Sequence, residues 1–132
     1  MDGSGKKVRF KKNIVPRPFV VGIKKKLTIK DMGTVYLAPN EQLTFITENK
    51  NRYDVARKNW GFYATPSINS RLKKEGFKTA LVRNSLNRIF VMIVEKKRMP
   101  IFKKYLNTQN CDLLTWLDKN YNLKKIKKCL KK

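Results

Sequence analysis

Histidine is absent from this 132-residue chain, and its absence weakens the case for several kinds of active site. Without imidazole, a serine or cysteine nucleophile lacks its most common activating base. Zinc and two-metal sites lose their usual ligand. The six glycines are scattered and form no phosphate-binding loop, and no pair of carboxylates has a spacing suited to acid–base catalysis. We therefore predict a protein that is not an enzyme and uses no metal or cofactor.

Cysteine is also scarce, since Cys111 and Cys129 are the only two in the chain. They are too few and too far apart for a zinc site. We expect Cys111 to be a small buried hydrophobe and Cys129 to lie in a basic helical tail. A disulfide between them has no support in the sequence, so we expect a reducing compartment inside the cell, either the cytoplasm or an organelle matrix.

Long apolar runs are missing as well. No stretch of eighteen apolar residues occurs, so we expect no transmembrane segment. The basic start is followed by Ile14–Val15 and then Pro16-Arg17-Pro18, which does not match the continuous apolar core of a signal peptide. With 132 residues, 41% of them hydrophobic, the chain is long enough for one domain with a core that needs no disulfide or metal.

Acidic residues are few: nine Asp and Glu stand against 32 Lys and Arg, and the formal net charge is +23. Such an excess destabilises a compact monomer by self-repulsion unless a partner neutralises it. Proteins with this balance usually bind nucleic acid or an anionic surface. The composition therefore predicts a polyanionic partner.

The positive charge is concentrated at the two ends of the chain. Residues 1–30 contain ten basic residues and one acidic residue, and residues 119–132 contain seven basic residues and no acidic one. Pro16 and Pro18 impose extended backbone near the N-terminus. We predict a basic extended arm at 1–18 that is disordered until it binds, a single α+β domain at 19–118, and a basic C-terminal helix or tail at 119–132.

Short segments of alternating polarity between polar turns predict an antiparallel meander. In the segment 60–65, Trp60 and Phe62 alternate with Tyr63, so if Trp60 and Phe62 face inward, Tyr63 faces outward. The run 89–94 is apolar at every position, so we expect its strand to be central and buried. The predicted strands cover 19–30, 34–38, 42–47, 52–57, 60–65, 77–83, 88–95 and 112–118, the last being ambiguous between strand and helix, with strand favoured.

The clearest helix signal covers residues 66–75. Thr65 can cap this helix, Pro66 suits its first position and Gly76 can end it. Two more helices are predicted at 98–108 and at 121–131. The predicted fold class is α+β: a mainly antiparallel sheet, made of the meander and extended by the later hairpin, with two or three helices packed on it and basic terminal extensions.

The segment 60–71 combines aromatic side chains, a tight passage from strand to helix and small polar residues. The start of the predicted helix offers free N–H groups and the positive end of a dipole, so Ser67, Asn69 and Arg71 form a candidate anion pocket. The alternative is that Thr65 and Ser67 cap the helix while the neighbouring aromatics fill the core. Among the carboxylates, we expect Asp54 to pair with a basic residue across its strand.

The C-terminal run 123–132 is amphipathic and basic, and three interpretations stay open. The helix can lie along a phosphate backbone, dock on an anionic membrane, or pack its apolar stripe on the domain with lysines outward. The stripe is short and lacks Trp and Phe, which makes the membrane the weakest of the three. The other two are compatible with each other.

The leading prediction is a small, non-enzymatic protein associated with RNA or DNA, in particular a ribonucleoprotein subunit of a ribosome-like assembly. Tyr63, exposed beside basic residues, is a candidate for stacking on bases. The alternative is an accessory subunit that binds an acidic protein partner, an anionic glycan or a membrane surface. The candidate contacts are Lys6, Lys7, Arg9, Lys11, Lys12, Arg17, Arg57, Lys58, Tyr63, Arg71, Lys73, Lys74, Lys124, Lys125, Lys127 and Lys128.

Overall fold

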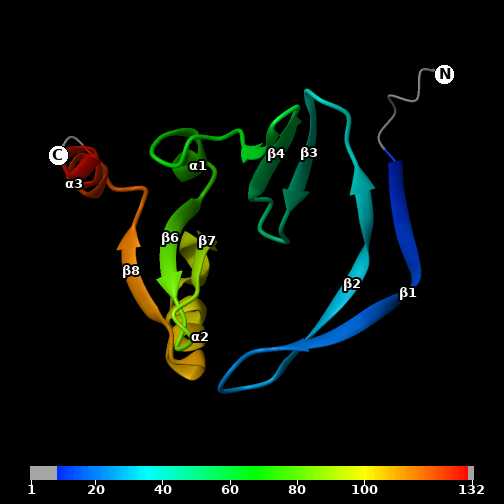
Figure 1. The fold of residues 1–132 in the computed structure, drawn as a ribbon, viewed down its shortest axis with the longest axis horizontal. Helices are drawn as coiled ribbons and strands as arrows, with labels where there is room; N and C mark the ends of the chain where they lie inside the picture. The colour runs from blue at the N-terminus through cyan, green and yellow to red at the C-terminus, as the bar shows by residue number, and fades with distance from the viewer. Residues whose placement is uncertain (1–8, 131–132) are drawn as a thin grey trace.

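The computed structural model describes residues 9–130, which contain eight strands and three α-helices (Figure 1). Every strand pair among them is antiparallel, so the predicted α+β class with antiparallel pairing is confirmed. The strands form three sheets, with the orders β1–β2, β3–β4–β5 and β7–β6–β8. The sequence analysis expected one sheet extended by the later hairpin, and in this respect the structure differs.

The N-terminal hairpin consists of β1 (Arg9–Val21) and β2 (Leu27–Tyr36), and it curves along one side of the molecule (Figure 1). The pairing shifts register between Lys12 and Arg17, around Pro16. A proline has no N–H to donate, and a bulge in a two-stranded ribbon accommodates it. From residue 9 onward, the arm predicted at 1–18 is therefore a paired strand. Residues 1–8 lie outside the described part of the chain.

The second sheet contains β3 (Glu41–Ile46), β4 (Arg52–Lys58) and β5 (Gly61–Ala64), close to the predicted strands. In its register Leu43 lies opposite Val55, which lies opposite Ala64, so these three side chains share one face. Thr44 and Asp54 lie opposite each other on the other face. One face of this sheet is thus mainly apolar and the other is polar.

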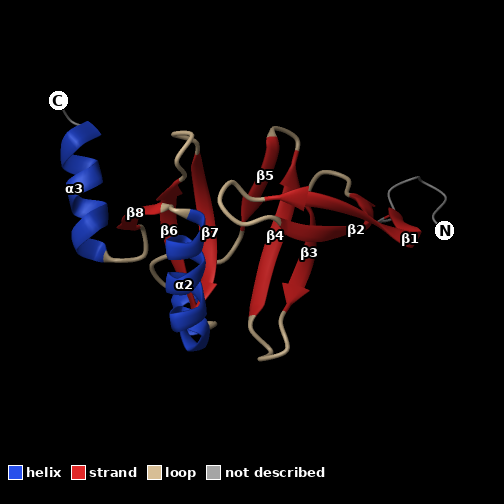
Figure 2. Cartoon of the chain, turned by 90° about the horizontal axis from the view of Figure 1, so that it is seen from below, coloured by secondary structure: helices blue, strands red, loops and turns tan. Residues whose placement is uncertain are grey.

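The third sheet contains β7 (Ile89–Glu95), β6 (Phe77–Arg83) and β8 (Asp112–Trp116), with β6 in the centre. A 3₁₀ turn (Lys96–Arg98) leads into α2 (Met99–Gln109), which lies along this sheet (Figure 2). Pro100 stands in its first turn, and Asn110, in the left-handed conformation, ends it. The core lies between α2 and the sheet and contains Ala80, Val82, Val94 and Leu106.

Strand β7 is an edge strand, so the prediction that it is central and buried is wrong. β8 pairs with β6 and leaves β7 at the border of the sheet. Val94 faces the core, whereas Val91, on the face opposite α2, is 60% exposed. Apolar residues on both faces therefore do not mark a buried strand here. They mark a strand at the edge of a sheet: α2 covers one face, and on the other face Phe77 and Thr79 of β6 are buried while Val91 of β7 is exposed.

Helix α1 (Arg71–Lys74) is much shorter than the helix predicted at 66–75. Ser70, which precedes it, has non-helical backbone angles, and residues 68–70 form a turn. The Thr65 hydroxyl, expected to cap the helix, donates instead to Gln42 Oε1 at 2.8 Å. Leu72 is fully buried, so even this single turn contributes to the packing.

Polar side chains connect the three sheets. Glu95 at the end of β7 accepts hydrogen bonds from Thr47 Oγ1 at 2.9 Å and Asn49 Nδ2 at 3.0 Å, which follow β3. Gln109 at the end of α2 accepts from the Ile23 N–H at 3.1 Å and donates to the Lys25 carbonyl at 2.7 Å. These bonds hold the second sheet and the N-terminal hairpin against the C-terminal unit, which consists of the third sheet and α2.

Candidate nucleic-acid interface

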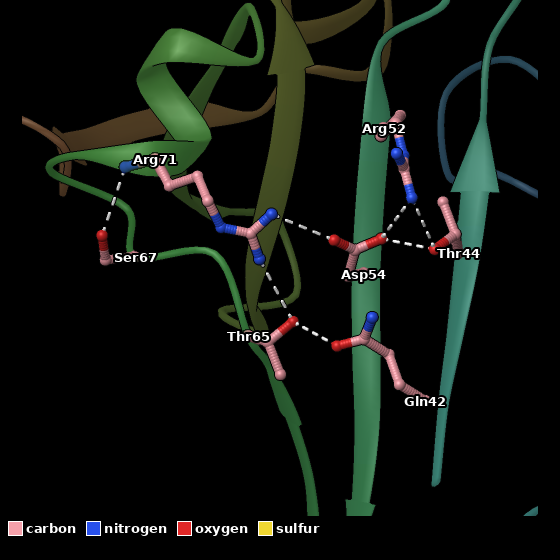
Figure 3. Close-up of polar contacts among 7 residues, drawn as sticks. All are labelled: Gln42, Thr44, Arg52, Asp54, Thr65, Ser67 and Arg71. Atoms are coloured by element: carbon pink, nitrogen blue, oxygen red, sulfur yellow. Dashed lines mark hydrogen bonds and ion pairs between the residues drawn. The ribbon is translucent and has the colours of Figure 1, made fainter.

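Asp54 is the centre of a polar cluster on the second sheet (Figure 3). It is only 4% exposed, and its carboxylate accepts from Thr44 Oγ1 at 2.5 Å and from Arg71 Nη1 at 3.2 Å. Arg52 Nη2 lies 4.0 Å from the same carboxylate. The prediction that Asp54 pairs with a basic residue is confirmed, although the closest partner comes from α1 and not from a neighbouring strand.

This environment lowers the pKa of Asp54. The hydrogen bond from Thr44 has the largest lowering effect, with help from Arg71 and Arg52, and it outweighs the opposing effect of burial. The carboxylate is therefore ionised at neutral pH and fixes the Arg71 guanidinium. Arg71 also donates to Thr65 Oγ1 at 3.5 Å, and Asn51 Nδ2 donates to the Glu75 carbonyl at 2.6 Å, so both ends of α1 are attached to the second sheet.

The three residues of the candidate anion pocket are close in sequence, but their polar groups do not converge on one point. Ser67 Oγ accepts the backbone N–H of Arg71 at 3.3 Å. The Arg71 guanidinium points away from Ser67, toward Asp54 and Thr65 (Figure 3). Asn69 is exposed in the turn before α1. In the alternative interpretation, Ser67 does bond to the start of the helix, but Thr65 does not cap it.

The β4–β5 hairpin presents three aromatic side chains to solvent. Trp60 is 68% exposed, Phe62 66% and Tyr63 46%. The alternative in which Trp60 and Phe62 fill the core is wrong, because this end of the sheet has no covering layer among the described residues. Trp60 and Tyr63 are neighbours, with ring centroids 6.0 Å apart and planes inclined by 31°.

Cationic residues of β1 lie along the N-terminal hairpin. Arg9, Lys11, Lys12 and Arg17 are all exposed. The Arg17 guanidinium pairs with Asp31 at 3.2 Å, and the Arg9 guanidinium lies 5.4 Å from the centre of the Tyr36 ring. The Gly33 N–H and then Arg17 lower the pKa of Asp31. Lys6 and Lys7 lie outside the described residues.

Helix α3 (Asn120–Leu130) carries the four predicted lysines of the tail, all of them exposed: Lys124, Lys125, Lys127 and Lys128. Lys125 Nζ lies 4.5 Å from the centre of the Tyr121 ring. Just before the helix, buried Asp118 accepts from the Thr79 N–H and from Lys78 Nζ, both at 3.3 Å. This carboxylate fixes the start of α3 to the third sheet.

The remaining predicted contacts surround the second sheet. Arg57 donates to the Leu37 carbonyl at 3.3 Å, and Lys58 donates to Asn40 Oδ1 at 2.6 Å. On α1, Lys73 is half-buried and Lys74 exposed. These residues lie on different elements from the cations of β1 and α3, so the structure distributes the predicted contacts over three surfaces and does not gather them into one pocket.

Sequence reasoning missed the loop between β1 and β2 as a candidate contact. Lys24, Lys25 and Lys26 are consecutive and exposed in this loop. The signal that could have identified them is Gly22, which has a φ of +104° and directly precedes Ile23 and the three lysines. A glycine beside a short charged run is typical of a hairpin turn.

The described residues 9–130 contain no group of three or more metal-ligating acidic, cysteine or histidine side chains. Within the same range, no helix combines the length and apolarity needed to cross a bilayer. Cys111 and Cys129 are free thiols; Cys111 is half-buried, and burial raises its pKa. No protein-family model matches the chain, and searches of curated proteins and of solved structures give no significant match.

Proposed function

We propose that the protein binds a polyanion, with RNA as the leading candidate, and that it is a non-enzymatic subunit of a ribonucleoprotein assembly. The observation that carries the proposal is the position of the charge. The open end of the basic N-terminal hairpin and the basic helix α3 lie at opposite ends of the long axis, while the loop of the hairpin reaches the end of α2 (Figure 1). Among the described residues of these two elements, Asp31 is the only acidic one.

The two basic ends are suited to contact separate phosphate segments. Each lysine or arginine that neutralises a phosphate releases condensed counterions, and this release makes binding favourable and dependent on salt. In the described part, ion pairs with carboxylates involve only five cationic side chains, namely Arg17, Arg52, Arg71, Lys78 and Arg83. Most cations are therefore available to an external anion.

Equilibrium binding to a mixed-sequence RNA at several salt concentrations tests the proposal. A variant with Lys124, Lys125, Lys127 and Lys128 replaced by Gln removes four charges from α3. We expect the slope of log K against log salt to become less steep by up to about 3, at about 0.7 to 0.9 for each phosphate that the variant no longer neutralises. A hairpin variant with Lys11, Lys12, Lys24 and Lys26 replaced by Gln should have a similar effect.

The matched control removes four exposed lysines from the middle of the chain, with Lys96, Lys97, Lys103 and Lys104 replaced by Gln. Its net charge equals that of the two test variants, so it measures the general effect of charge. If the control changes the slope as much as the test variants do, the ends have no special role. Absence of salt-sensitive binding to both RNA and DNA would contradict the proposal as a whole.

One observation favours a second candidate function, that of an accessory subunit for an acidic protein partner. Helix α3 exposes Ile126 and Leu130 beside its lysines. A phosphate backbone leaves these apolar side chains in water, whereas an apolar groove with an acidic rim covers them. A partner that remains bound after nuclease treatment, and is lost when Ile126 and Leu130 are changed to Ser, would favour this candidate.

A further inference from the structure

The tip of the β4–β5 hairpin combines three features that no packing role explains. It exposes Trp60, Phe62 and Tyr63, it is adjacent to cationic residues, and it has no acidic residue nearby in sequence. A large exposed aromatic surface on a highly charged protein is unfavourable unless a partner covers it. The chemistry of that partner follows from the arrangement of the rings and the charges.

The rings of Trp60 and Tyr63 form a pair on one side of the hairpin. Their centroids are 6.0 Å apart and their planes are inclined by only 31°. In the strand register Tyr63 lies opposite Ala56, which places it on the same face as Lys58. Phe62 lies opposite Arg57 and faces the other way. The hairpin therefore presents a two-ring surface on one face and a single ring on the other.

The charge that accompanies this pair favours an anionic partner. Residues 55–74 include the cations Arg57, Lys58, Arg71, Lys73 and Lys74 and no acidic residue. In the strand register Lys58 shares the face of Tyr63, whereas Arg57 lies on the face of Phe62, opposite Glu41. The preceding carboxylate, Asp54, is buried and bound to Arg71 and Thr44. A ligand for the tip is thus planar or apolar where it meets the rings and negatively charged beside them.

From this arrangement we infer that the Trp60–Tyr63 pair stacks on unpaired bases, so that the preferred ligand is single-stranded nucleic acid. The inference rests on the proposed function and narrows its ligand class. Bases in a duplex are already stacked, and their faces are not available to protein rings, whereas bases of a single strand are free to stack. Lys58 shares the face of Tyr63 and donates to Asn40 Oδ1 at 2.6 Å, and a backbone phosphate of the stacked nucleic acid would replace Asn40 as its partner.

The test compares three ligands for the full chain: a twelve-nucleotide single-stranded RNA, an RNA duplex of the same length, and heparin. Heparin is polyanionic but has no bases. We expect Trp60→Ala and Tyr63→Ala each to weaken binding to the single strand by about tenfold, the scale of one lost base stack. Heparin binding should change by less than twofold. Phe62→Ala, at an equally exposed ring on the opposite face, is the matched control and should bind all three ligands like the wild type.

Fluorescence provides a second measurement that does not depend on affinity. The chain contains two tryptophans, and Trp116 is half-buried against the core. A Trp116→Phe variant reports on Trp60 alone, and a Trp60→Phe variant reports on Trp116 alone. We expect the single strand to quench Trp60 emission strongly and heparin to leave it nearly unchanged, with Trp116 insensitive to both.

The outcomes distinguish failure of the base-stacking inference from failure of the proposed function. Base stacking is wrong, and polyanion binding stands, if Trp60→Ala binds the single strand as tightly as the wild type. The same holds if its affinities for heparin and for RNA fall by the same factor. Equal affinity for duplex and single strand, without quenching of Trp60, likewise overturns the inference. If the wild type binds neither RNA nor heparin in a salt-sensitive manner, the proposed function fails and the inference fails with it.

Discussion

The two halves of the molecule hold their shape in different ways. In the C-terminal unit, α2 packs on β6 and β7 and buries a continuous apolar cluster around Val82 and Leu106. In the N-terminal part, the β1–β2 hairpin leaves Phe10 and Val20 exposed, and the second sheet leaves Phe45 exposed. A protein of this size can therefore concentrate its core in one unit and attach the other by polar contacts and a ring contact between Tyr53 and Phe77.

This difference bears on the proposed function because the exposed half also carries the basic hairpin and the aromatic tip. Surfaces with few buried apolar contacts open at low free-energy cost and adapt to a ligand. The C-terminal unit supplies the rigid support, and Gln109 and Glu95 are its attachment points. We expect core mutations in the C-terminal unit to have the largest effect on the stability of the whole protein, and mutations in the N-terminal hairpin to act locally.

The largest effect is expected from Leu106→Ala in the core of the C-terminal unit. The change leaves a cavity between α2 and the sheet and should lower the free energy of unfolding by about 3 kcal/mol, as is typical of buried leucines. Urea unfolding followed by circular dichroism measures it. Ile101→Ala, at an exposed position of the same helix, should cost less than about 0.5 kcal/mol. Equal losses would mean that α2 does not pack on a core.

An intermediate effect is expected from Asp54→Asn, which removes the charge at the centre of the polar cluster. The free energy of unfolding, measured by urea denaturation, should fall by about 2 kcal/mol, because the hydrogen bond from Thr44 and the pair with half-exposed Arg71 both weaken. Asp112→Asn, in a more exposed pair with Arg83, should change stability by less than about 0.5 kcal/mol. If the two variants are equally stable, the cluster does not anchor α1.

The same variant has a defined dependence on pH. The pKa of Asp54 is lowered in the folded protein, so its contribution is fully present above the ordinary carboxyl pKa of about 4 and disappears as pH falls through the lowered value. The stability difference between wild type and Asp54→Asn should therefore shrink progressively below about pH 4. Unfolding midpoints between pH 7 and pH 2.5 measure it. A difference that grows with acidification would contradict the lowered pKa.

The smallest global effect is expected from Gly22→Ala in the loop of the N-terminal hairpin. Gly22 has a φ of +104°, and a Cβ there would clash with the Lys25 carbonyl oxygen. The strain should be relieved by local opening, so hydrogen exchange of β1 and β2 amides should accelerate while the free energy of global unfolding changes by less than about 0.5 kcal/mol. Thr28→Ala, an exposed position in β2, is the control. Faster exchange throughout β6 as well would show that the two halves unfold together.

Local sequence patterns predicted the elements better than their arrangement. The structure places β6 at 77–83, as predicted, and α2 and α3 each within one residue of the predicted limits. These elements have clear periodicity and clear ends, such as Pro100 in the first turn of α2. The partner of β8 was not predictable in the same way, because strand pairing depends on contacts distant in sequence. The wrong position of β7 follows from this.

The candidate site was predictable in its charges but not in its aromatic surface. The cations of β1 and α3 are apparent from composition alone, and the structure finds them exposed. The alternative in which Trp60 and Phe62 fill the core assumed that a layer covers this end of the sheet. Alternation shows which residues share a face. Whether another layer covers that face depends on the whole fold.

The bonds from Gln109 to the N-terminal hairpin also have a consequence for biosynthesis. Gln109 and its partner Ile23 are 86 residues apart, so the anchor is translated long after the hairpin. At about 5 to 20 residues per second, the interval is about 4 to 17 seconds. During this time the basic hairpin lacks the two hydrogen bonds by which Gln109 attaches it in the folded protein. If the proposed polyanion binding is correct, a ligand bound to the hairpin during translation would neutralise its charge over this interval.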